Sequence, residues 1–378
     1  MIENVFYIDN KEFTASSLIF KEFDVKSIFK NYHLSIIDEP ETYRKVLEYA
    51  INNKILFVDS NVNTLHYISK KLENKDKLIV REASENLKTI EGALEIISLF
   101  DEKNITKNEN IIVCGGGIIQ DVVAFSSSVY KRGIPWAFFP TTLLSMCDSC
   151  LGGKASLNYK NAKNQIALYS TPKEIIINPN FLRTLPEQDI RSGLGEILKM
   201  FIIGGEAYFD LYKEIIKNIS FSNTSEFIPL ICNSLNIKKN IVEADEYEKD
   251  SRKVLNYGHT VGHAIEILSE YKIPHGLSIV AGMIIANELS SEYGYISKLE
   301  KTAINNICYD LLGEKTLNTL KNLDFSSISD IIIKDKKASD NNISFVFIKS
   351  LGKSVFKEII LTDAINKKIG DIISHSFL

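Results

Sequence analysis

Three of the six histidines in this chain lie within one short stretch, "NYGHTVGHAIEILSEYKIPHG" (256–276). His259 and His263 are four residues apart, so a helix would place both imidazoles on one face. His275 follows a proline and is expected to begin the next helix, from which it could reach the same point. Neutral imidazoles at this spacing are a recurring metal arrangement, so the stretch predicts a metal site. Histidines on a helix surface, or buried histidines whose hydrogen bonds are made within the core, would show the same spacing.

A carboxylate is a common partner of imidazoles around a divalent metal. The best candidate is Glu196 in "GLGEILK", where leucine and isoleucine surround a single acid. A buried charge in such a helix needs a partner. The H-E-x-x-H pattern of zinc peptidases is absent, because Thr260 stands where those enzymes carry their catalytic glutamate.

A glycine-rich turn, "CGGGIIQDVVAF" (114–125), follows an apolar run and is expected to open a helix. Backbone N–H groups at such a helix start can bind a pyrophosphate. The dinucleotide-binding fingerprint fails at its third glycine, which is Gln120, and a tight strand-to-helix turn explains the pattern nearly as well. Asp59, at the end of another apolar run, could bind a ribose hydroxyl or cap a helix.

The stretch "PTTLLSMCDSCLGGKASLNYKNAKNQ" (140–165) is rich in polar groups, and further cations accompany the helical segments after it. A collection of lysine, arginine and asparagine in an acidic protein suits a small anionic substrate. Taken singly, each lysine is equally consistent with a solvated surface. "CDSC" (147–150) has no second cysteine pair for a zinc ribbon, and small semi-buried thiols beside Asp148 are the favoured interpretation.

Composition limits the classes of protein that remain. The chain has 378 residues, a formal net charge of −4 and five cysteines, an odd number that does not suggest a disulfide framework. The acidic balance argues against a nucleic-acid binder. We expect no signal peptide and no membrane span, hence a cytoplasmic protein without nucleic-acid or membrane partners.

The elements expected along the chain fall into two regions, one that alternates strands with helices and one that is mainly helical. Residues 54–60, 110–117 and 173–179 read as buried strands, and 84–103 reads as a helix capped by Ser84. After residue 186 long helical patterns follow at 187–203, 228–245, 258–271 and 275–294, and 343–359 reads as a hairpin. The sequence therefore predicts an α/β nucleotide-binding domain over 1–180 and a mainly helical metal- and substrate-binding domain over 181–378.

Several motifs together resemble one known family. "GGGIIQD", "PTTLL…DSCLGGK", "TLPEQDIRSGLGEILK", "IKKNIVEADE", "RKVLNYGHTVGHAIE" and "PHGLSIVAGM" occur in the order and rough spacing of the 3-dehydroquinate synthase family, the sugar phosphate cyclases. The resemblance covers about residues 55 to 350. It implies an NAD-binding α/β domain followed by a helical metal-binding domain.

The resemblance also implies roles for individual residues. It makes Glu196, His259 and His275 the ligands of Zn²⁺, with Co²⁺ as an alternative ion. The NAD contacts it implies are Asp59, Glu85, Lys88, Gly116, Gly117, Asp121, Thr141, Thr142, Lys154, Lys163 and Thr184. The substrate-binding and catalytic residues it implies are Asp148, Lys154, Asn164, Lys199, Lys238, Arg252, Asn256 and His263, with either Lys336 or Lys337. Arg132 resembles an arginine that the family supplies across a dimer interface, so a homodimer is expected.

The activity implied is that of a phosphate-eliminating carbon–oxygen lyase. The substrate would be 3-deoxy-arabino-heptulosonate 7-phosphate, closed to a carbocycle with catalytic NAD, as in the shikimate pathway of aromatic amino acid biosynthesis. Lys238, Arg252 and Asn256 match residues that serve the substrate carboxylate. Cyclases that act on sedoheptulose 7-phosphate or a related sugar phosphate have no carboxylate to neutralise, and a buried arginine without a counter-charge would be costly there.

Some positions depart from the family pattern. Gln120 replaces a glycine, "GGKAS" stands for "GGKTG", and Cys147 and Cys150 are unusual neighbours of Asp148. These departures keep a second sugar phosphate cyclase, of a secondary or polysaccharide pathway, as the alternative. A metal-dependent alcohol dehydrogenase of the same wider architecture and a non-catalytic sensor are the remaining rivals, because fold alone does not determine function.

Overall fold

A computed structural model describes residues 3–17, 19–51, 55–160, 162–328, 331–332, 342–360 and 362–377. The chain forms two compact units. The sheet unit comprises Ile19–Pro186 and Ser220–Leu235, and the helical unit comprises Met1–Leu18, Glu187–Ile219 and Asn236–Leu378. None of the described helices is both long enough and apolar enough to span a membrane.

The sheet unit is built on seven strands in the order β3-β4-β11-β8-β7-β5-β6. They are β3 (Glu22–Val25), β4 (Tyr32–Ile36), β5 (Ile55–Asp59), β6 (Leu78–Arg81), β7 (Ile111–Gly115), β8 (Trp136–Pro140) and β11 (Glu174–Ile177). Only β3 runs antiparallel to its neighbour. Every residue of β5, β7 and β8 is buried, as expected for parallel strands covered on both faces.

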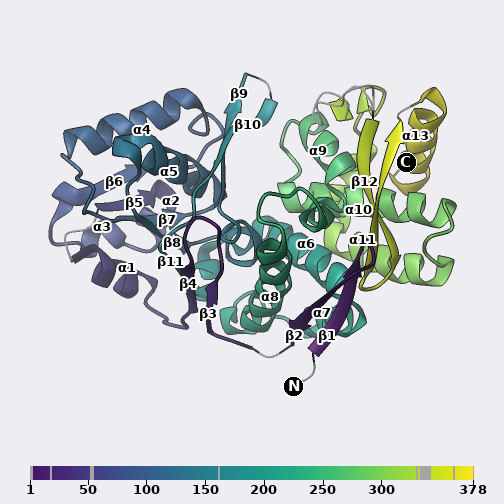
Figure 1. Ribbon diagram of the computed structural model, residues 1–378, viewed down its shortest axis with the longest axis horizontal. Coiled ribbons are helices and arrows are strands. Elements are labelled where there is room, and N and C mark those ends of the chain that lie inside the picture. Colours follow the sequence, from purple (N-terminus) through teal and green to yellow (C-terminus); the bar gives the residue numbers. More distant parts are fainter. Residues whose placement is uncertain are drawn as a thin grey trace. The chain divides into compact units, whose positions relative to one another are not determined.

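Helices cover this sheet. They are α1 (Thr42–Ile51), α2 (Ser60–Leu65), α3 (Ile68–Lys71), α4 (Ile90–Glu102) and α5 (Gly117–Val129). Figure 1 shows α4 and α5 above the strands and α1 below them. The three strands expected from the sequence in this unit are confirmed. Helix α4 begins later than expected, because the Thr89 hydroxyl, rather than Ser84, caps it by accepting from the Gly92 N–H at 3.1 Å.

Six helices with described bounds lie wholly within the helical unit, beside a small sheet. The helices are α6 (Glu187–Gly204), α7 (Glu206–Asn218), α9 (His259–Leu268), α10 (His275–Glu292), α11 (Lys298–Lys321) and α13 (Asp363–Phe377). Its sheet has the order β12-β13-β1-β2, with β1 (Glu3–Ile8), β2 (Lys11–Ser16), β12 (Asn342–Ser350) and β13 (Lys353–Ile360). The expected hairpin at 343–359 is present as β12 and β13.

The division between the units differs from the single boundary expected near residue 180. The first 18 residues belong to the helical unit, because β1 pairs in parallel with β13 through Tyr7 and Ile8. Helix α8 (Ile228–Ala244) begins in the sheet unit and ends in the helical unit, and the later change of unit falls between Pro186 and Glu187. Pairing between strands far apart in sequence leaves no local signal. The assignment of the N-terminal residues to the helical unit was therefore not predictable from the sequence.

Close helix packing at the centre of the helical unit depends on two glycines. A Cβ on Gly276 would lie 1.9 Å from the Ser192 carbonyl oxygen of α6, and one on Gly282 would lie 2.0 Å from the Gly258 carbonyl oxygen at the start of α9. The Gly276 N–H also donates to the Ser192 hydroxyl at 2.9 Å. Helix α10 therefore approaches α6 and α9 more closely than a side chain would allow. This approach brings the start of α10 onto the middle of α6.

Candidate active site

The three clustered histidines come together in the helical unit. One ring nitrogen from each of His259, His263 and His275 lies within 4.8 Å of the others. The rings are 5.2 to 5.6 Å apart between centroids. His259 and His263 occupy successive turns of α9, as their spacing predicts, and His275 is the first residue of α10.

Glu196 joins this cluster from α6. Its side chain is fully buried, and its Oε1 lies 3.8 Å from His259 Nε2 and 3.4 Å from His275 Nε2. Its Oε2 pairs with the ammonium of Lys199, one turn further along α6. The expectation that this buried acid needs a partner is confirmed. Burial disfavours the charged form, but Lys199 and His275 outweigh it and hold the pKa of Glu196 well below its usual range.

The protons on two of the histidines follow from their neighbours. His259 Nδ1 lies 3.2 Å from the Tyr257 carbonyl oxygen, which can only accept, so Nδ1 carries the proton and Nε2 presents a lone pair. Burial, together with the charges of Lys199 and the other histidines, lowers the pKa of His259 well below its usual value. His275 Nδ1 contacts Glu266 at 3.1 Å. Burial lowers the pKa of His275, but its bonds to Glu196 and Glu266 prevail and raise it to about 9.

Two further cations are buried in the same unit. Lys238, on α8, is 5% exposed, and Arg252, in a short 3₁₀ segment (Ser251–Asn256) that leads into α9, is 2% exposed. The guanidinium of Arg252 donates to the Glu246 carbonyl oxygen. Asn256 ends the same segment and donates through Nδ2 to Glu248. An arginine and a lysine at this depth make the region attractive to an anion.

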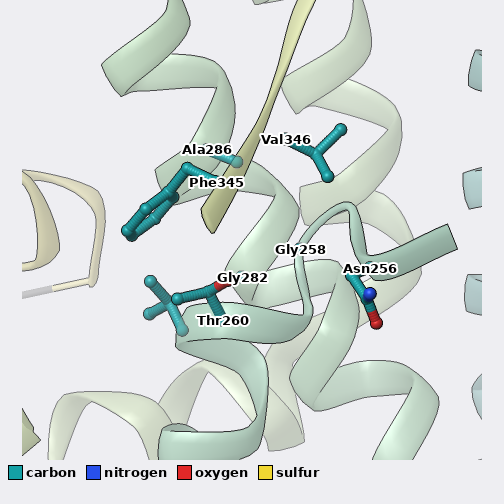
Figure 2. Close-up of a pocket in the computed structure, with 8 residues that line it drawn as sticks. Asn256, Gly258, Thr260, Gly282, Ala286, Phe345 and Val346 are labelled. Carbon is teal, nitrogen blue, oxygen red and sulfur yellow. The ribbon is translucent and has the colours of Figure 1, made fainter. Parts of the chain in front are cut away.

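Asp245 organises the loop that carries Arg252. Its carboxylate accepts the backbone N–H groups of Lys249 at 3.0 Å, Asp250 at 2.7 Å and Arg252 at 3.0 Å. These three bonds hold the backbone between α8 and the 3₁₀ segment in one conformation. Figure 2 shows the small hollow beside this segment, which is lined by residues of the α9 start, α10 and β12. None of the three histidines lines it, so it is not the candidate metal centre.

The predicted NAD residues lie in the sheet unit, and several of them contact one another. Lys88 pairs with Asp121 at 2.6 Å and donates to Asn164 at 2.9 Å. Lys163 pairs with Glu85 at 3.1 Å. These contacts join the turn before α4, the first turns of α5 and the hairpin of β9 (Lys154–Tyr159) and β10 (Ala162–Tyr169). Burial raises the pKa of the Asp121 carboxyl, although the Lys88 ammonium opposes it.

The glycine-rich turn has the expected form. Gly116 caps α5 without a side chain, directly after β7, and Thr141 donates its N–H to the Gly115 carbonyl oxygen at 3.0 Å. A Cβ on Gly116 would meet the Thr142 methyl group at 3.0 Å. The start of α5 therefore presents bare backbone N–H groups.

The other predicted residues of the sheet unit lie apart from this network or serve the fold. Asp59 caps α2: one carboxylate oxygen accepts from Asn61 N at 2.7 Å and Val62 N at 3.2 Å, and the other accepts from Ala83 N at 3.1 Å. Lys154 is exposed at the first position of β9, and Asp148 is half-buried in a π-helical turn (Ser145–Ser149). Arg132 and Thr184 are exposed. Lys336 and Lys337 lie outside the described residues.

Comparisons with known proteins agree with this arrangement. The sequence profile of the 3-dehydroquinate synthase N-terminal domain matches residues 78–192, and that of the C-terminal domain matches residues 193–338. A 3-dehydroquinate synthase of Clostridium tetani (strain Massachusetts / E88) is 34% identical over 341 residues, which cover 88% of this chain and 90% of the relative. This chain belongs to the 3-dehydroquinate synthase family.

Solved structures of sugar phosphate cyclases share the fold of this family member. The 2-epi-5-epi-valiolone synthase of Streptomyces hygroscopicus subsp. jinggangensis 5008, with NAD⁺ and Zn²⁺ bound, has a TM-score of 0.77 at 20% identity over 91% of this chain and 96% of that one. A 2-deoxy-scyllo-inosose synthase complexed with carbaglucose-6-phosphate, NAD⁺ and Co²⁺ has a TM-score of 0.74 at 20% identity, over 93% of this chain and 99% of that one. The two-domain cyclase fold expected from the sequence is thereby confirmed.

Two acids of the site were missed from the sequence. Glu248 contacts Asn256, and Glu266 contacts His275. Glu266 follows His259 and His263 at the spacing i, i+4, i+7, so all three lie on one face of α9, and this pattern was available in the sequence. Glu248 carries no such signal, because its backbone has a positive φ of 56° in a loop whose shape depends on Asp245.

Proposed function

We propose that this member of the 3-dehydroquinate synthase family is itself a 3-dehydroquinate synthase. It would convert 3-deoxy-arabino-heptulosonate 7-phosphate into a carbocycle with loss of phosphate, and NAD would be regenerated within each cycle. The observation that carries the choice of substrate is the buried Arg252, which lies in the unit of the histidine cluster and only seven residues before His259. A buried guanidinium binds a carboxylate through strong, charge-assisted hydrogen bonds, and the proposed substrate carries a carboxylate.

The donor set of the histidine cluster fits a divalent metal. His259 presents a neutral imidazole nitrogen toward Glu196 Oε1, and His275 approaches the same oxygen through its Nε2. Two imidazoles and a carboxylate, with a further position for substrate, are typical ligands of catalytic zinc, so we propose Zn²⁺, with Co²⁺ able to replace it. Lys199 occupies the second oxygen of Glu196, which leaves Oε1 as the atom that would hold the metal.

The bound groups would supply the redox and Lewis-acid chemistry: NAD accepts and returns a hydride, and the metal polarises the reacting hydroxyl. The side chains of the chain itself position the substrate. Lys238, Arg252 and Asn256 would bind its carboxylate side. Its phosphate would be bound by Lys154, Asn164, Lys199 and His263, with Lys336 or Lys337 and, in a homodimer, Arg132 of a second copy. Asp148 would orient the substrate beside them.

We place NAD in the sheet unit. The start of α5, with Gly116 and Gly117, would bind the pyrophosphate through backbone N–H groups. The other contacts proposed for NAD are Asp59, Glu85, Lys88, Asp121, Thr141, Thr142, Lys154, Lys163 and Thr184. The network between Lys88, Asp121 and Asn164 supports this proposal, since it holds the polar groups around the α5 start in fixed positions. Both carboxylate oxygens of Asp59 are already engaged, one by the cap at α2 and the other by the Ala83 N–H.

The test is phosphate release with catalytic NAD and Zn²⁺. The keto-acid phosphate and sedoheptulose 7-phosphate are compared in parallel, on the natural chain, on Arg252→Met and on Arg252→Lys. We expect release from the keto acid alone, at least 100-fold lower kcat/KM in the Met variant, and partial recovery in the Lys variant, because a buried charge-assisted pair is worth several kcal/mol. Arg191→Ala, which removes a half-buried arginine of α6 paired with Glu187, is the matched control.

Two results would contradict the proposal. Release from sedoheptulose 7-phosphate and not from the keto acid would identify a cyclase of the carboxylate-free branch. Stoichiometric accumulation of NADH without phosphate release would identify a dehydrogenase. In either case the role given to Arg252 would be wrong.

A further inference from the structure

A second buried carboxylate lies behind the candidate metal centre. Glu266, in the last full turn of α9, is 6% exposed, and its Oε2 lies 3.1 Å from His275 Nδ1. The opposite nitrogen of the same ring, Nε2, lies 3.4 Å from Glu196 Oε1. His275 is therefore held between two acids, one on each ring nitrogen.

The chain reaches this geometry through a tight reversal between α9 and α10. Glu270 and Tyr271 have positive φ angles of 51° and 61°, and the Tyr271 N–H donates to the backbone carbonyl oxygen of Glu266 at 3.0 Å. The reversal returns the chain to the side of α9 that carries Glu266. Its side chain consequently meets a residue nine positions later rather than one on its own helix.

The partner on Nδ1 matters because a metal ligand must present a lone pair. An ionised carboxylate can only accept, so Glu266 places the proton of His275 on Nδ1 and leaves Nε2 to face Glu196. The Tyr257 carbonyl oxygen does the same for His259. The two imidazoles thus have different supports, a charged side chain for one and a neutral backbone group for the other.

We propose that Glu266 is the positioning residue for His275 as a metal ligand. Its carboxylate would orient the ring, direct Nε2 toward the ion and make the imidazole a stronger electron-pair donor to the metal. The inference rests on the proposed function, since it requires that the histidine cluster binds a divalent metal. Glu266 adds a second buried negative charge beside the ion, after that of Glu196. Lys199 offsets the charge of Glu196.

The experiment measures the dissociation constant for Zn²⁺ on the full-length chain, by competition with a chromophoric chelator. The visible absorption of bound Co²⁺ gives a second readout, which reports ligand geometry independently of activity. Glu266→Ala removes the acceptor, and the isosteric Glu266→Gln keeps an oxygen in place without the charge. We expect zinc affinity to fall by about 10–100-fold in the Ala variant and by less in the Gln variant, with NAD affinity unchanged.

Glu288→Gln is the matched control, because Glu288 on α10 accepts from Lys301 at 2.6 Å and from Asn305 at 3.0 Å in the same unit. Zinc affinity within twofold of the natural chain in Glu266→Ala would overturn the inference. An equal loss of zinc affinity in Glu288→Gln and Glu266→Gln would also overturn the inference, since it would indicate that either change loosens the helical unit as a whole. Failure of the natural chain to bind either ion would instead refute the proposed metal centre, and with it this role.

Discussion

Gln120 and Ser149 exchange two hydrogen bonds: the Gln120 side-chain amide donates to the Ser149 backbone oxygen, and the Ser149 hydroxyl donates to the Gln120 side-chain oxygen, each at 2.8 Å. Gln120 is one of the residues that depart from the family pattern, and Ser149 lies within the unusual "CDSC". The pair joins α5 to the π-helical turn that carries Asp148. The departure at Gln120 therefore contacts the turn that also carries the departures at Cys147 and Cys150.

Removing both members of this pair is expected to cost less than the sum of the two single removals. Gln120 is 3% exposed, so Gln120→Ala leaves the Ser149 hydroxyl and backbone oxygen without their hydrogen-bond partner at a buried position. We expect this change to lower the free energy of unfolding by about 1–3 kcal/mol. Ser149→Ala should cost less. Urea unfolding of both single variants and the double variant gives the coupling energy, expected at about 1 kcal/mol. Strict additivity would show that the two side chains do not support each other.

The glycine at the start of α10 provides a test of how the site is assembled. Gly276→Ala would place a methyl carbon 1.9 Å from the Ser192 carbonyl oxygen, so α10 must move away from α6. We expect a loss of about 1–3 kcal/mol in the free energy of unfolding and weaker zinc binding, since His275 moves with its helix. Gly370→Ala is the control: Gly370 lies within α13 with nothing within 4 Å of a Cβ, so that change should stabilise slightly.

Measurement of unfolding by circular dichroism and of zinc affinity by chelator competition separates the two effects. If Gly276→Ala bound zinc as tightly as the natural chain while losing stability, the close approach would serve the core and not the site.

The local parts of the site were predictable from the sequence. Helical spacing identifies His259 and His263 as neighbours on one face, and Glu196 stands out as a single acid in an apolar helix. Both signals come from residues that are close together along the chain. The contact between Glu266 and His275 is different. It depends on two residues with positive φ in the intervening reversal, neither of which is glycine, so no local pattern announces it.

Long-range pairing limited the fold prediction in the same way. The parallel pairing of β1 with β13 joins residues about 350 positions apart, and it assigns the first 18 residues to the helical unit. Nothing in the composition of residues 1–18 indicates this partner. By contrast the buried strands β5, β7 and β11 were apparent, because their apolar runs end in turn residues.

Acid should destabilise the sheet unit through His66. Its Nδ1 lies 2.7 Å from the Thr42 hydroxyl and its Nε2 lies 2.8 Å from the Thr184 hydroxyl, which itself donates to the Phe181 carbonyl oxygen. The neutral ring therefore donates to Thr184 and accepts from Thr42. Burial lowers the pKa of His66 from 6.5 to about 4.

Because the folded state resists this proton, the unfolded state binds more protons between pH 6.5 and pH 4, and stability falls as the pH drops through that window. We expect His66 to account for about 1–2 kcal/mol of the loss, less than the full pKa difference implies, since water reaches the half-buried ring. Urea unfolding at pH 7.5 and 4.5 is compared with His66→Gln, which should be less sensitive to pH, and with His375→Gln at an exposed site. Equal acid sensitivity in His66→Gln and the natural chain would rule His66 out.

The carboxylate of Asp245 should control the loop that carries Arg252. Asp245→Ala removes the acceptor of three backbone N–H groups, at Lys249, Asp250 and Arg252, and the unfolding free energy should fall by about 1–3 kcal/mol. Hydrogen exchange of these three amides should accelerate at least tenfold, and the KM for the keto-acid phosphate should rise more than kcat falls, because Arg252 loses its fixed position. Asp324→Ala is the control, since the exposed Asp324 lies in the same unit and accepts from the backbone N–H and the side chain of Ser326. Unchanged exchange at Lys249 and Asp250 in Asp245→Ala would show that the loop holds its shape without this carboxylate, and that Arg252 is positioned by its bond to the Glu246 carbonyl oxygen instead.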